Sequence, residues 1–357
     1  MSGDSLIYGL EFQARTLAAH VSETEKTQFF IGTQSLKLAN NQIHLVQLNE
    51  DDNSLHAQIY KHKEGEIWAL SASTKDPNLI TSCYNAEVDG KFCMKSSLWK
   101  IPAEQDTEVQ KLCDFDVEEY GTDIKISTFH PNDGGQVATV VDNKVLIWNV
   151  AEDSCKLSCT IVMEGKGQPK FTTGKWNTPI NAQFATANDC CVRGWDTRNP
   201  SKHAWIIENA HLQLVRDIDF NPNRHHFLAT CGDDGRSRFW DIRNTSQPLI
   251  SRSDHSHWVW SIRYNHYHDE LIASASSDTR VLITRIQSIS SSSILPEEET
   301  TKDKLSDRVI ATFDQHEDSV YCVEWSAADP WILASLSYDG RLLINRVPKD
   351  EKYKILL

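Results

Sequence analysis

Short apolar segments recur along this chain and are separated by turns rich in Gly, Asp and Asn. In the segment that begins at His211, apolar side chains return at Val215, Ile218 and Phe220, as in a strand with one face against a core. The fully apolar run FLAT follows and suits a strand buried on both faces. A Gly/Asp-rich turn then leads to a third strand that ends at Trp240, and a short fourth strand closes the unit. Sustained helical periodicity is absent, so the pattern predicts an all-β protein.

This four-strand pattern is an internal repeat. Further copies are found in the segments that begin at Phe129, Phe184, His255 and His316. The Asp residues that align in their turns are Asp142, Asp189, Asp234, Asp278 and Asp339, and the intervals between them are 47, 45, 44 and 61 residues. A period in the mid-forties with several short strands per unit is typical of the blades of a WD-repeat β-propeller.

Two less regular units precede these copies, so we predict a single seven-bladed WD-repeat β-propeller that fills residues 1–357. The expected blades span residues 6–61, 62–115, 120–163, 167–208, 211–252, 255–314 and 316–357. Ile7, Leu10 and Phe12 match the inner-strand spacing of blade five, which predicts that they form the first inner strand. The last residues, YKILL, would then close blade seven as its outer strand. The alternative is a ring in which an N-terminal strand completes the last blade.

Residues 288–308 interrupt the repeat between the third and fourth strands of blade six. They are crowded with Ser, Glu and Lys and offer few side chains to a core, so we predict a disordered loop. A spacer is the simplest role for it, and a phosphorylated control segment is the alternative.

One polar set in the repeat could be mistaken for a catalytic triad: His211, Thr230, Asp234 and Trp240. Their places in the unit instead predict a buried hydrogen-bond chain from indole through hydroxyl and imidazole to carboxylate, which ties the strands together. Incomplete copies recur in the other blades as His255, Ser274, Asp278 and Thr284, as His316, Ser335, Asp339 and Asn345, and as Trp148 and Trp195 without an aligned His. A catalytic group would not recur as degraded copies. No phosphate-binding loop, metalloprotease or nucleophile motif is present, so we predict that the protein is not an enzyme.

Composition and the absence of targeting signals restrict the classes of partner and the cellular compartment that we expect for this protein. The formal net charge of −14 disfavours nucleic acid, whose phosphates need clustered Lys and Arg. The sequence has neither a secretory signal nor an apolar run near the ~20 residues that span a bilayer, which predicts a cytoplasmic protein without direct membrane insertion. The nine Cys form no CxxC pair, so we expect reduced thiols, no metal and no cofactor.

A candidate partner surface is expected at the narrow end of the ring. The residue after the first apolar position of each inner strand should lie there, and in the alignable blades these residues are Tyr8, Trp68, Lys125, Arg216, Trp260 and Tyr321. Trp258 and Tyr338 in the adjacent loops extend the set. Aromatic and Arg side chains dominate interface hot spots, so we predict that Trp68, Arg216, Trp258, Trp260, Tyr321 and Tyr338 bind a partner. The alternative is that the rings pack between blades.

A second candidate is the tetrapeptide WDxR, which occurs at Trp195 and again at Trp240. It resembles the box by which some WD-repeat proteins dock onto the adaptor of a cullin-RING ubiquitin ligase. Arg198 and Arg243 would be the contacting residues, and the protein would then be a substrate receptor.

Longer words in the sequence resemble one family. GLEFQAR, GTQSL, ATAND, RGWDTR, QLVRDIDFNPN, HSHWVW, HEDSVY, ADPW, ASLSYDGRL and INRVP occur in order between residues 7 and 357. They are similar to the EARP- and GARP-complex-interacting WD-repeat family, and the resemblance weakens in the Ser/Glu loop and around residues 85–120. It implies a non-catalytic adaptor that binds subunits of the GARP and EARP tethering complexes at the trans-Golgi network and endosomes. It further implies roles in retrograde transport, endocytic recycling and dense-core vesicle maturation.

Overall fold

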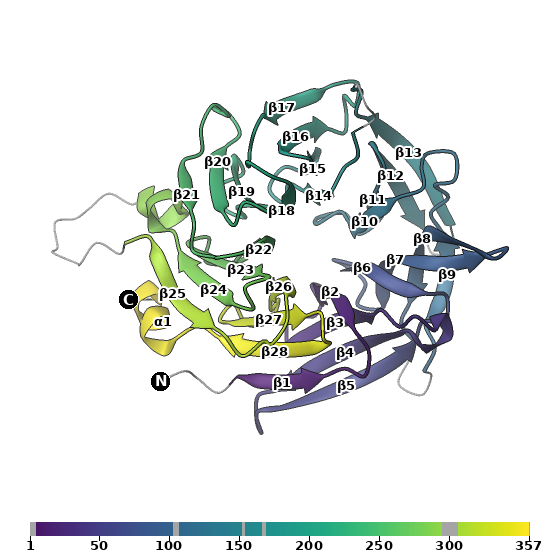
Figure 1. Ribbon diagram of the computed structural model, residues 1–357, viewed down its shortest axis with the longest axis horizontal. Coiled ribbons are helices and arrows are strands. Elements are labelled where there is room, and N and C mark those ends of the chain that lie inside the picture. Colours follow the sequence, from purple (N-terminus) through teal and green to yellow (C-terminus); the bar gives the residue numbers. More distant parts are fainter. Residues whose placement is uncertain (1–4, 103–106, 152–153, 166–168, 295–305, 357) are drawn as a thin grey trace.

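The computed structural model describes residues 5–102, 107–151, 154–165, 169–294 and 306–356. Within them the chain forms seven four-stranded sheets that stand as blades around a central axis (Figure 1). The predicted all-β, seven-bladed propeller is therefore confirmed.

In the first six blades, the four strands follow one another along the chain from the axis outward. Blades one to three are formed by β2 (Ala14–Ala19), β3 (Gln28–Thr33), β4 (Gln42–Asn49), β5 (Ser54–Lys61); β6 (Glu66–Ala72), β7 (Leu79–Val88), β8 (Lys91–Lys100), β9 (Gln110–Asp114); and β10 (Ile124–Phe129), β11 (Gln136–Val141), β12 (Lys144–Ala151), β13 (Ser154–Val162). Blades four to six are formed by β14 (Thr173–Trp176), β15 (Gln183–Asn188), β16 (Cys191–Asp196), β17 (His203–Ile207); β18 (Val215–Phe220), β19 (Phe227–Gly232), β20 (Ser237–Asp241), β21 (Ile250–Arg252); and β22 (Val259–Tyr264), β23 (Leu271–Ser276), β24 (Val281–Arg285), β25 (Arg308–Phe313). A single 3₁₀ turn, Leu38–Asn40, lies between β3 and β4.

The core lies between neighbouring blades. Every residue of β19, β23 and β27 (Ile332–Ser337) is buried, as their uninterrupted apolar runs predict. Side chains of blade five such as Ile218 pack in one cluster with Val192 of blade four. Because each fully buried aliphatic side chain contributes about 1.5–3 kcal/mol, contacts between neighbouring blades hold the ring together.

The ring closes differently from the prediction. β1 (Leu6–Gly9) is the outer strand of blade seven, where it pairs with β28 (Arg341–Arg346); β27 and the innermost β26 (Val320–Trp325) complete the sheet. Residues 7–12 therefore do not form the first inner strand, which is β2. The spacing of Ile7, Leu10 and Phe12 was misleading, because the side chain of Ile7 is 56% exposed whereas Leu6 and Tyr8 face the core. The alternative closure by an N-terminal strand is the correct one.

The C-terminal residues also differ from the prediction. Residues 349–356, which include most of YKILL, form the helix α1 (Lys349–Leu356) rather than an outer strand. Asp350 and Glu351 lie in its first turn and Lys354 in its last, which favours a helix through its dipole. Glu351 is buried and accepts hydrogen bonds from Arg285 at 2.7 Å and Arg308 at 2.8 Å, which fix the helix to blade six.

The insertion in blade six lies between β24 and β25, as predicted. Its first residues are not a disordered loop, because Gln287–Ile289 and Ser291–Ile294 form two short 3₁₀ helices. The Ser288 hydroxyl donates a hydrogen bond to Asp307 at 2.6 Å, and the Ser291 hydroxyl donates one to Asp269 at 2.6 Å. At the other end of the predicted loop, Arg308 is already the first residue of β25. Residues 295–305 of the predicted loop lie outside the described residues.

Candidate protein-interaction site

The polar set of blade five is brought together by its first three strands. His211 precedes β18, Thr230 lies on β19 and Asp234 lies in the turn that follows. The imidazole Nε2 of His211 is 2.8 Å from the Thr230 hydroxyl, and its Nδ1 is 2.8 Å from Asp234 Oδ1. The indole N–H of Trp240 donates to the same hydroxyl at 3.0 Å. These side chains are at most 5% exposed, so this hydrogen-bond chain lies inside the blade rather than open to a substrate.

The charge on Asp234 is held by its neighbours. Burial works against the carboxylate, but hydrogen bonds from His211, the Leu212 N–H and Arg238 outweigh it and hold the pKa of Asp234 well below its usual range. Burial in turn lowers the pKa of His211, although Asp234 opposes that shift. Asp278 in blade six has a similarly depressed pKa, since it accepts hydrogen bonds from His255, the Ser256 N–H and Arg280 despite its burial.

Blade seven departs from this geometry. His316 Nε2 is 2.8 Å from the Ser335 hydroxyl, as the alignment predicts, but its Nδ1 is 2.8 Å from the hydroxyl of Ser337. Ser337 in turn donates to Asp339 at 2.5 Å, so the aligned carboxylate reaches the imidazole only through a serine. Burial lowers the pKa of His316 to about 4.

Blade two carries a partial set that the sequence analysis missed. The indole N–H of Trp99 donates to the Ser82 hydroxyl at 2.7 Å, and His62 Nε2 is 3.2 Å from the same oxygen. His62 follows the end of the first blade just as His211 follows the fourth, and this spacing could have revealed it. Blade four has only the indole half, in which Trp195 donates to Thr186 at 2.8 Å.

A β-bulge interrupts the innermost strand of every blade except the fourth. In five of the six, the first residue pairs with the second strand, the next is skipped and pairing resumes after it; in β6 the first two residues pair before the skipped one. The skipped residues are Arg15, Trp68, Lys125, Arg216, Trp260 and Tyr321. Bulges redirect a side chain out of the regular pleat. The bulges therefore place a ring of large side chains at the end of the propeller where the innermost strands begin.

Five aromatic rings and two Arg side chains of this end form a continuous surface, which we call the cation–aromatic belt. Its members are Arg15, Trp68, Arg216, Trp258, Trp260, Tyr321 and Tyr338. Trp258 directly precedes β22 and Tyr338 directly follows β27, so both lie at the same end of the sheets as the bulges.

The belt is held by ring contacts between blades. The centroid of Trp260 is 6.0 Å from that of Trp258 and 4.7 Å from that of Tyr321, which is 5.8 Å from Tyr338. The guanidinium of Arg216 is 4.3 Å from the centroid of Trp260, and its carboxylate partner, Asp233, is 2.6 Å away. The structure thus brings all six predicted partner-binding residues together. Their binding to a partner remains a prediction.

Arg15 is the member that the sequence analysis missed. Its guanidinium lies 4.0 Å from the centroid of the Tyr321 ring and 5.4 Å from that of Trp68, and so joins blade seven to blade two. The predicted occupant of this position was Tyr8. That assignment was wrong because β1 belongs to blade seven, where the Tyr8 hydroxyl is 2.9 Å from His44 Nδ1.

The rings are not absorbed into the core. Trp68 and Trp258 are each 41% exposed, and none of the five aromatic residues of the belt is among the fully buried residues. The rings also contact one another and the Arg side chains of neighbouring blades, as the alternative interpretation, that the rings pack between blades, predicts. Each cation–π contact at such an exposed site is expected to stabilise the arrangement of the side chains by about 0.5–1 kcal/mol. The belt is therefore an ordered surface that offers both polar and apolar groups to a partner.

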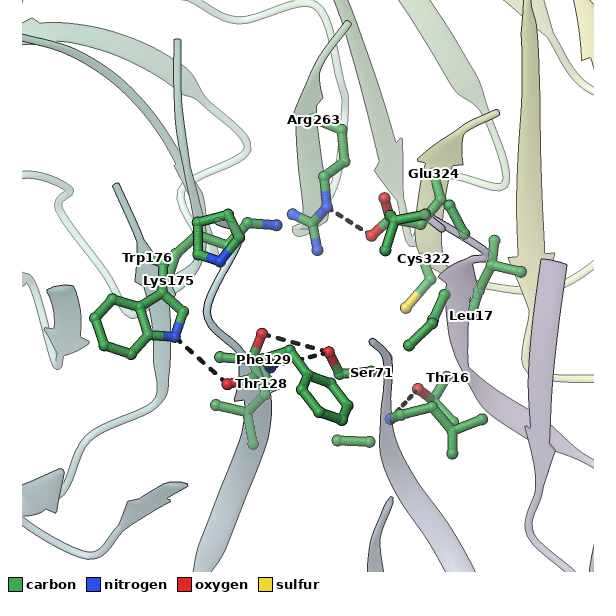
Figure 2. Close-up of a pocket in the computed structure, with 18 of the residues that line it drawn as sticks. Thr16, Leu17, Ser71, Thr128, Phe129, Lys175, Trp176, Arg263, Cys322 and Glu324 are labelled. Carbon is green, nitrogen blue, oxygen red and sulfur yellow. Dashed lines mark hydrogen bonds and ion pairs between the residues drawn. The ribbon is translucent and has the colours of Figure 1, made fainter. Parts of the chain in front are cut away.

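Behind the belt, a cavity of about 510 Å³ is lined by residues of the innermost strands. Figure 2 shows Arg263 and Glu324 side by side at the edge of the cavity, with the indole of Trp176 turned to the carbonyl of Thr128. Arg263 pairs with Asp217 and lies 2.7 Å from Glu324. Burial disfavours the charge on Arg263, but these two carboxylates raise its pKa above the usual range. The single guanidinium is thus shared between two carboxylates. No cluster of three or more potential metal-ligating side chains occurs in the described ranges.

The two WDxR arginines lie in matching turns after β16 and β20. Arg198 makes a two-pronged contact with Asp196 at 2.6 and 2.9 Å, and Arg243 does the same with Asp241. Their side chains are 76% and 62% exposed. Each guanidinium is therefore accessible and held in a fixed direction by the motif's own Asp.

The blades, the repeated His–hydroxyl and indole–hydroxyl contacts, and the bulged inner strands define a WD-repeat β-propeller. Comparison with known families agrees: the family model described as EIPR1 beta-propeller matches residues 2–283, and the WD domain, G-beta repeat model matches residues 307–344. The chain belongs to the EIPR1 beta-propeller family.

Curated relatives extend over nearly the whole chain. The human EARP and GARP complex-interacting protein 1 is 44% identical over 99% of this chain and 98% of its own length. The zebrafish EARP-interacting protein homolog is 45% identical with the same coverage. The Caenorhabditis elegans EARP-interacting protein 1 is 30% identical over 99% of both chains.

In the part of the chain that the structure describes, no helix has the length and apolar character needed to cross a bilayer.

Proposed function

We propose that this chain is a non-catalytic adaptor that binds the EARP and GARP vesicle-tethering complexes through the cation–aromatic belt. In this role it recruits the complexes to membranes in endosome-to-Golgi retrograde transport, endocytic recycling and dense-core vesicle maturation. Its place would be the cytoplasm, peripherally associated with the trans-Golgi network and endosomes. Support for the partners comes from the relatives, whose names describe interaction with these complexes.

The observation that carries the proposed surface is the combination of exposure and order in the belt. Trp68 and Trp258 expose large apolar faces, while Arg15 and Arg216 hold the neighbouring rings in place. Such preorganised aromatic and Arg side chains lose little conformational entropy on binding and are the residues most often found at hot spots. The surface is therefore suited to a protein partner with an apolar anchor and a polar rim.

The test is binding of the purified protein to immobilised EARP or GARP complex, measured by biolayer interferometry. We expect the double variant Trp68→Ala/Trp258→Ala to weaken binding by about a hundredfold, since two hot-spot residues of about 1–2 kcal/mol each are lost. The matched control is Tyr267→Ala/Tyr353→Ala, which removes two similarly exposed aromatic rings outside the belt. Equal weakening by both double variants would overturn the proposed surface. Absence of binding by the unaltered protein would overturn the proposed partners.

Membrane recruitment is tested separately in cells. In cells that lack the protein, we expect the unaltered chain to restore tethering complexes to endosomes and the trans-Golgi network. The Trp68→Ala/Trp258→Ala variant should fail to restore them, and the Tyr267→Ala/Tyr353→Ala variant should succeed. Normal localisation of the complexes without the protein would contradict a recruiting role.

The second candidate function is a substrate receptor of a cullin-RING ubiquitin ligase. It is favoured by the two exposed guanidinium groups of Arg198 and Arg243, which occupy equivalent turns of neighbouring blades. Affinity purification of the variant Arg198→Ala/Arg243→Ala tests it, with Arg346→Ala, another exposed Arg, as the control. Selective loss of the ligase adaptor from the double variant would support the receptor function. An unchanged set of partners would remove it.

A further inference from the structure

The hairpin of blade two is longer than its counterparts. β7 and β8 have ten residues each, whereas the second and third strands of the other blades have five to eight. Asp89 and Gly90 form the two-residue turn between them with φ values of 51° and 73°, a combination that keeps a hairpin tight. Figure 1 shows the β7–β8 hairpin reaching outward past the rim of the ring.

The outward part of β8 has an open edge. β9 pairs with β8 only over Ser97–Lys100, and the last contact is the hydrogen bond from the Phe115 N–H to the Ser96 carbonyl at 2.9 Å. Across the described residues, Lys91–Lys95 pair with β7 alone. Backbone groups of alternate residues in an antiparallel strand point to opposite sides. Since the Ser96 carbonyl points towards β9, the N–H and C=O groups of Phe92 and Met94 face the open side.

A slot runs along this edge. A cavity of about 860 Å³ lies between the residues Phe92–Ser96 of β8 and the segment Asp114–Asp123 that follows β9. Four apolar side chains contribute to its walls: Phe92, Met94, Phe115 and Val117. The Phe92 side chain is 65% exposed, although it belongs to a strand. The slot thus presents a row of free backbone donors and acceptors beside apolar surface.

The slot is lined mainly by acidic groups. Its lining holds four carboxylates, those of Asp114, Asp116, Glu118 and Asp123, against the single ammonium group of Lys95. Asp114 is ion-paired with Lys111 at 3.4 Å and Asp123 with Lys125 at 2.8 Å, so Asp116 and Glu118 are the acidic groups left to attract an occupant. Asp116 and Glu118 are exposed. A cationic occupant would complement these groups, and an acidic one would be repelled.

A second copy of the chain is a poor occupant. Antiparallel pairing of two β8 edges centred on Cys93 would place Lys91 of each copy opposite Lys95 of the other. Like charges directly opposite each other on a sheet are destabilising. The acidic walls of the two slots would also approach each other.

We propose that this slot binds an extended, basic segment of a partner protein, which adds as a fifth strand to blade two along Lys91–Lys95. Strand addition of this kind draws its affinity from main-chain hydrogen bonds and its selectivity from side-chain pockets and charge. At about 3.4 Å per residue, the open edge accommodates a segment of about five residues. The slot is separate from the cation–aromatic belt, so this inference goes beyond the proposed function.

The experiment uses defined peptides and the full chain. Fluorescence anisotropy measures the binding of a labelled ten-residue peptide of alternating Lys and Val, of its Glu/Val counterpart, and of a Lys/Val peptide N-methylated at four consecutive central residues. We expect binding by the first peptide and weakening of at least about tenfold for the other two, because one reverses the charge and the other removes backbone donors. Equal binding of the N-methylated peptide would overturn strand addition, and equal binding of the Glu/Val peptide would overturn the basic occupant. No binding by any peptide would overturn the proposal.

Two substitutions of Phe92 distinguish the contribution of its backbone N–H to peptide binding from that of its side chain. Phe92→Pro removes the outward N–H without disturbing the bonds to β7, and we expect a loss of affinity of at least about tenfold. Phe92→Thr keeps that N–H and should lose only about threefold. Equal affinities of the two variants would contradict an edge-bound peptide, with melting temperatures confirming that both are folded. The Trp68→Ala/Trp258→Ala variant should bind the peptide normally, so that failure of the belt and failure of the slot are distinguishable.

Discussion

In blade five the imidazole of His211 contacts its carboxylate directly, whereas in blade seven the hydroxyl of Ser337 stands between His316 and Asp339. Both imidazoles are buried and both reach a second-strand hydroxyl at 2.8 Å. The difference lies in the electrostatic partner. Burial is the largest cause that lowers the pKa of both imidazoles. Asp234 opposes it at His211 through a hydrogen bond and its charge, whereas Asp339 opposes it at His316 through its charge alone, and the pKa of His316 falls to about 4.

The comparison shows that the same histidine position of the repeat can be stabilised in two ways, by a direct carboxylate contact or by a serine hydroxyl. With a direct carboxylate, the blade depends on a buried, charge-assisted hydrogen bond and is damaged when either partner is removed. With a serine relay, the blade holds a neutral imidazole among hydroxyls, where each lost hydrogen bond costs less. Three measurements would sharpen or break this distinction.

The largest effect is expected for the histidines themselves. His211→Ala leaves the carboxylate of Asp234 without its main partner and should lower the free energy of unfolding by about 3–4 kcal/mol. His316→Ala leaves only two serine hydroxyls and should lower it by about 1–2 kcal/mol. Urea denaturation followed by Trp fluorescence measures both. Equal losses would show that the serine relay is as strong as the direct contact.

The carboxylates should differ by a smaller amount. Asp234→Asn removes the charge that accepts hydrogen bonds from His211 and Arg238, and should cost about 2 kcal/mol. Asp339→Asn keeps an acceptor for Ser337 and should cost about 0.5 kcal/mol. Thermal unfolding of the two variants side by side provides the measurement. A larger cost at Asp339 would reverse the proposed order.

The most specific effect is the pH dependence. The unfolded His pKa is near 6.5, and those of folded His316 and His62 are about 4, so between these values the unfolded state binds more protons. Stability is therefore complete above about pH 6.5 and falls as the pH drops towards 4, by up to about 1.4 kcal/mol per pH unit for each group. Melting temperatures between pH 7 and 4.5 test this. The decline should be shallower in His316→Gln, and an unchanged slope in that variant would contradict a buried neutral imidazole.

The sequence predicted the number of blades because turn, strand and Trp signals recur with a fixed period. It did not predict the closure, since Ile7, Leu10 and Phe12 carry inner-strand spacing but only the competition with β2 decides which segment lies at the axis. That single error also hid Arg15, because Tyr8 was placed where Arg15 belongs.

The site was predicted in part for a similar reason. Trp68, Trp260, Tyr321 and Arg216 could be assigned from their place after the first apolar residue of each inner strand, and Trp258 and Tyr338 from the loops beside them. His62 was missed because the alignment was anchored on Asp turns, and no Asp partners its imidazole in the described residues. The sequence could not predict that the Ser337 hydroxyl stands between His316 and Asp339. Whether an imidazole contacts a carboxylate directly or through a hydroxyl depends on small differences in side-chain position that the repeat pattern does not encode.

The pairing of Leu6 with Ile344 has a consequence for how the chain is made. On the ribosome, β1 must remain unpaired until all seven blades up to β28 have been synthesised. During this interval both Leu6–Gly9 and the apolar flank of blade one stand open, which invites chaperone binding or mispairing with another nascent molecule. A nonsense mutation that removes β28 would leave the earlier blades intact in sequence yet deprive β1 of its partner, so even a late truncation should direct the product to degradation.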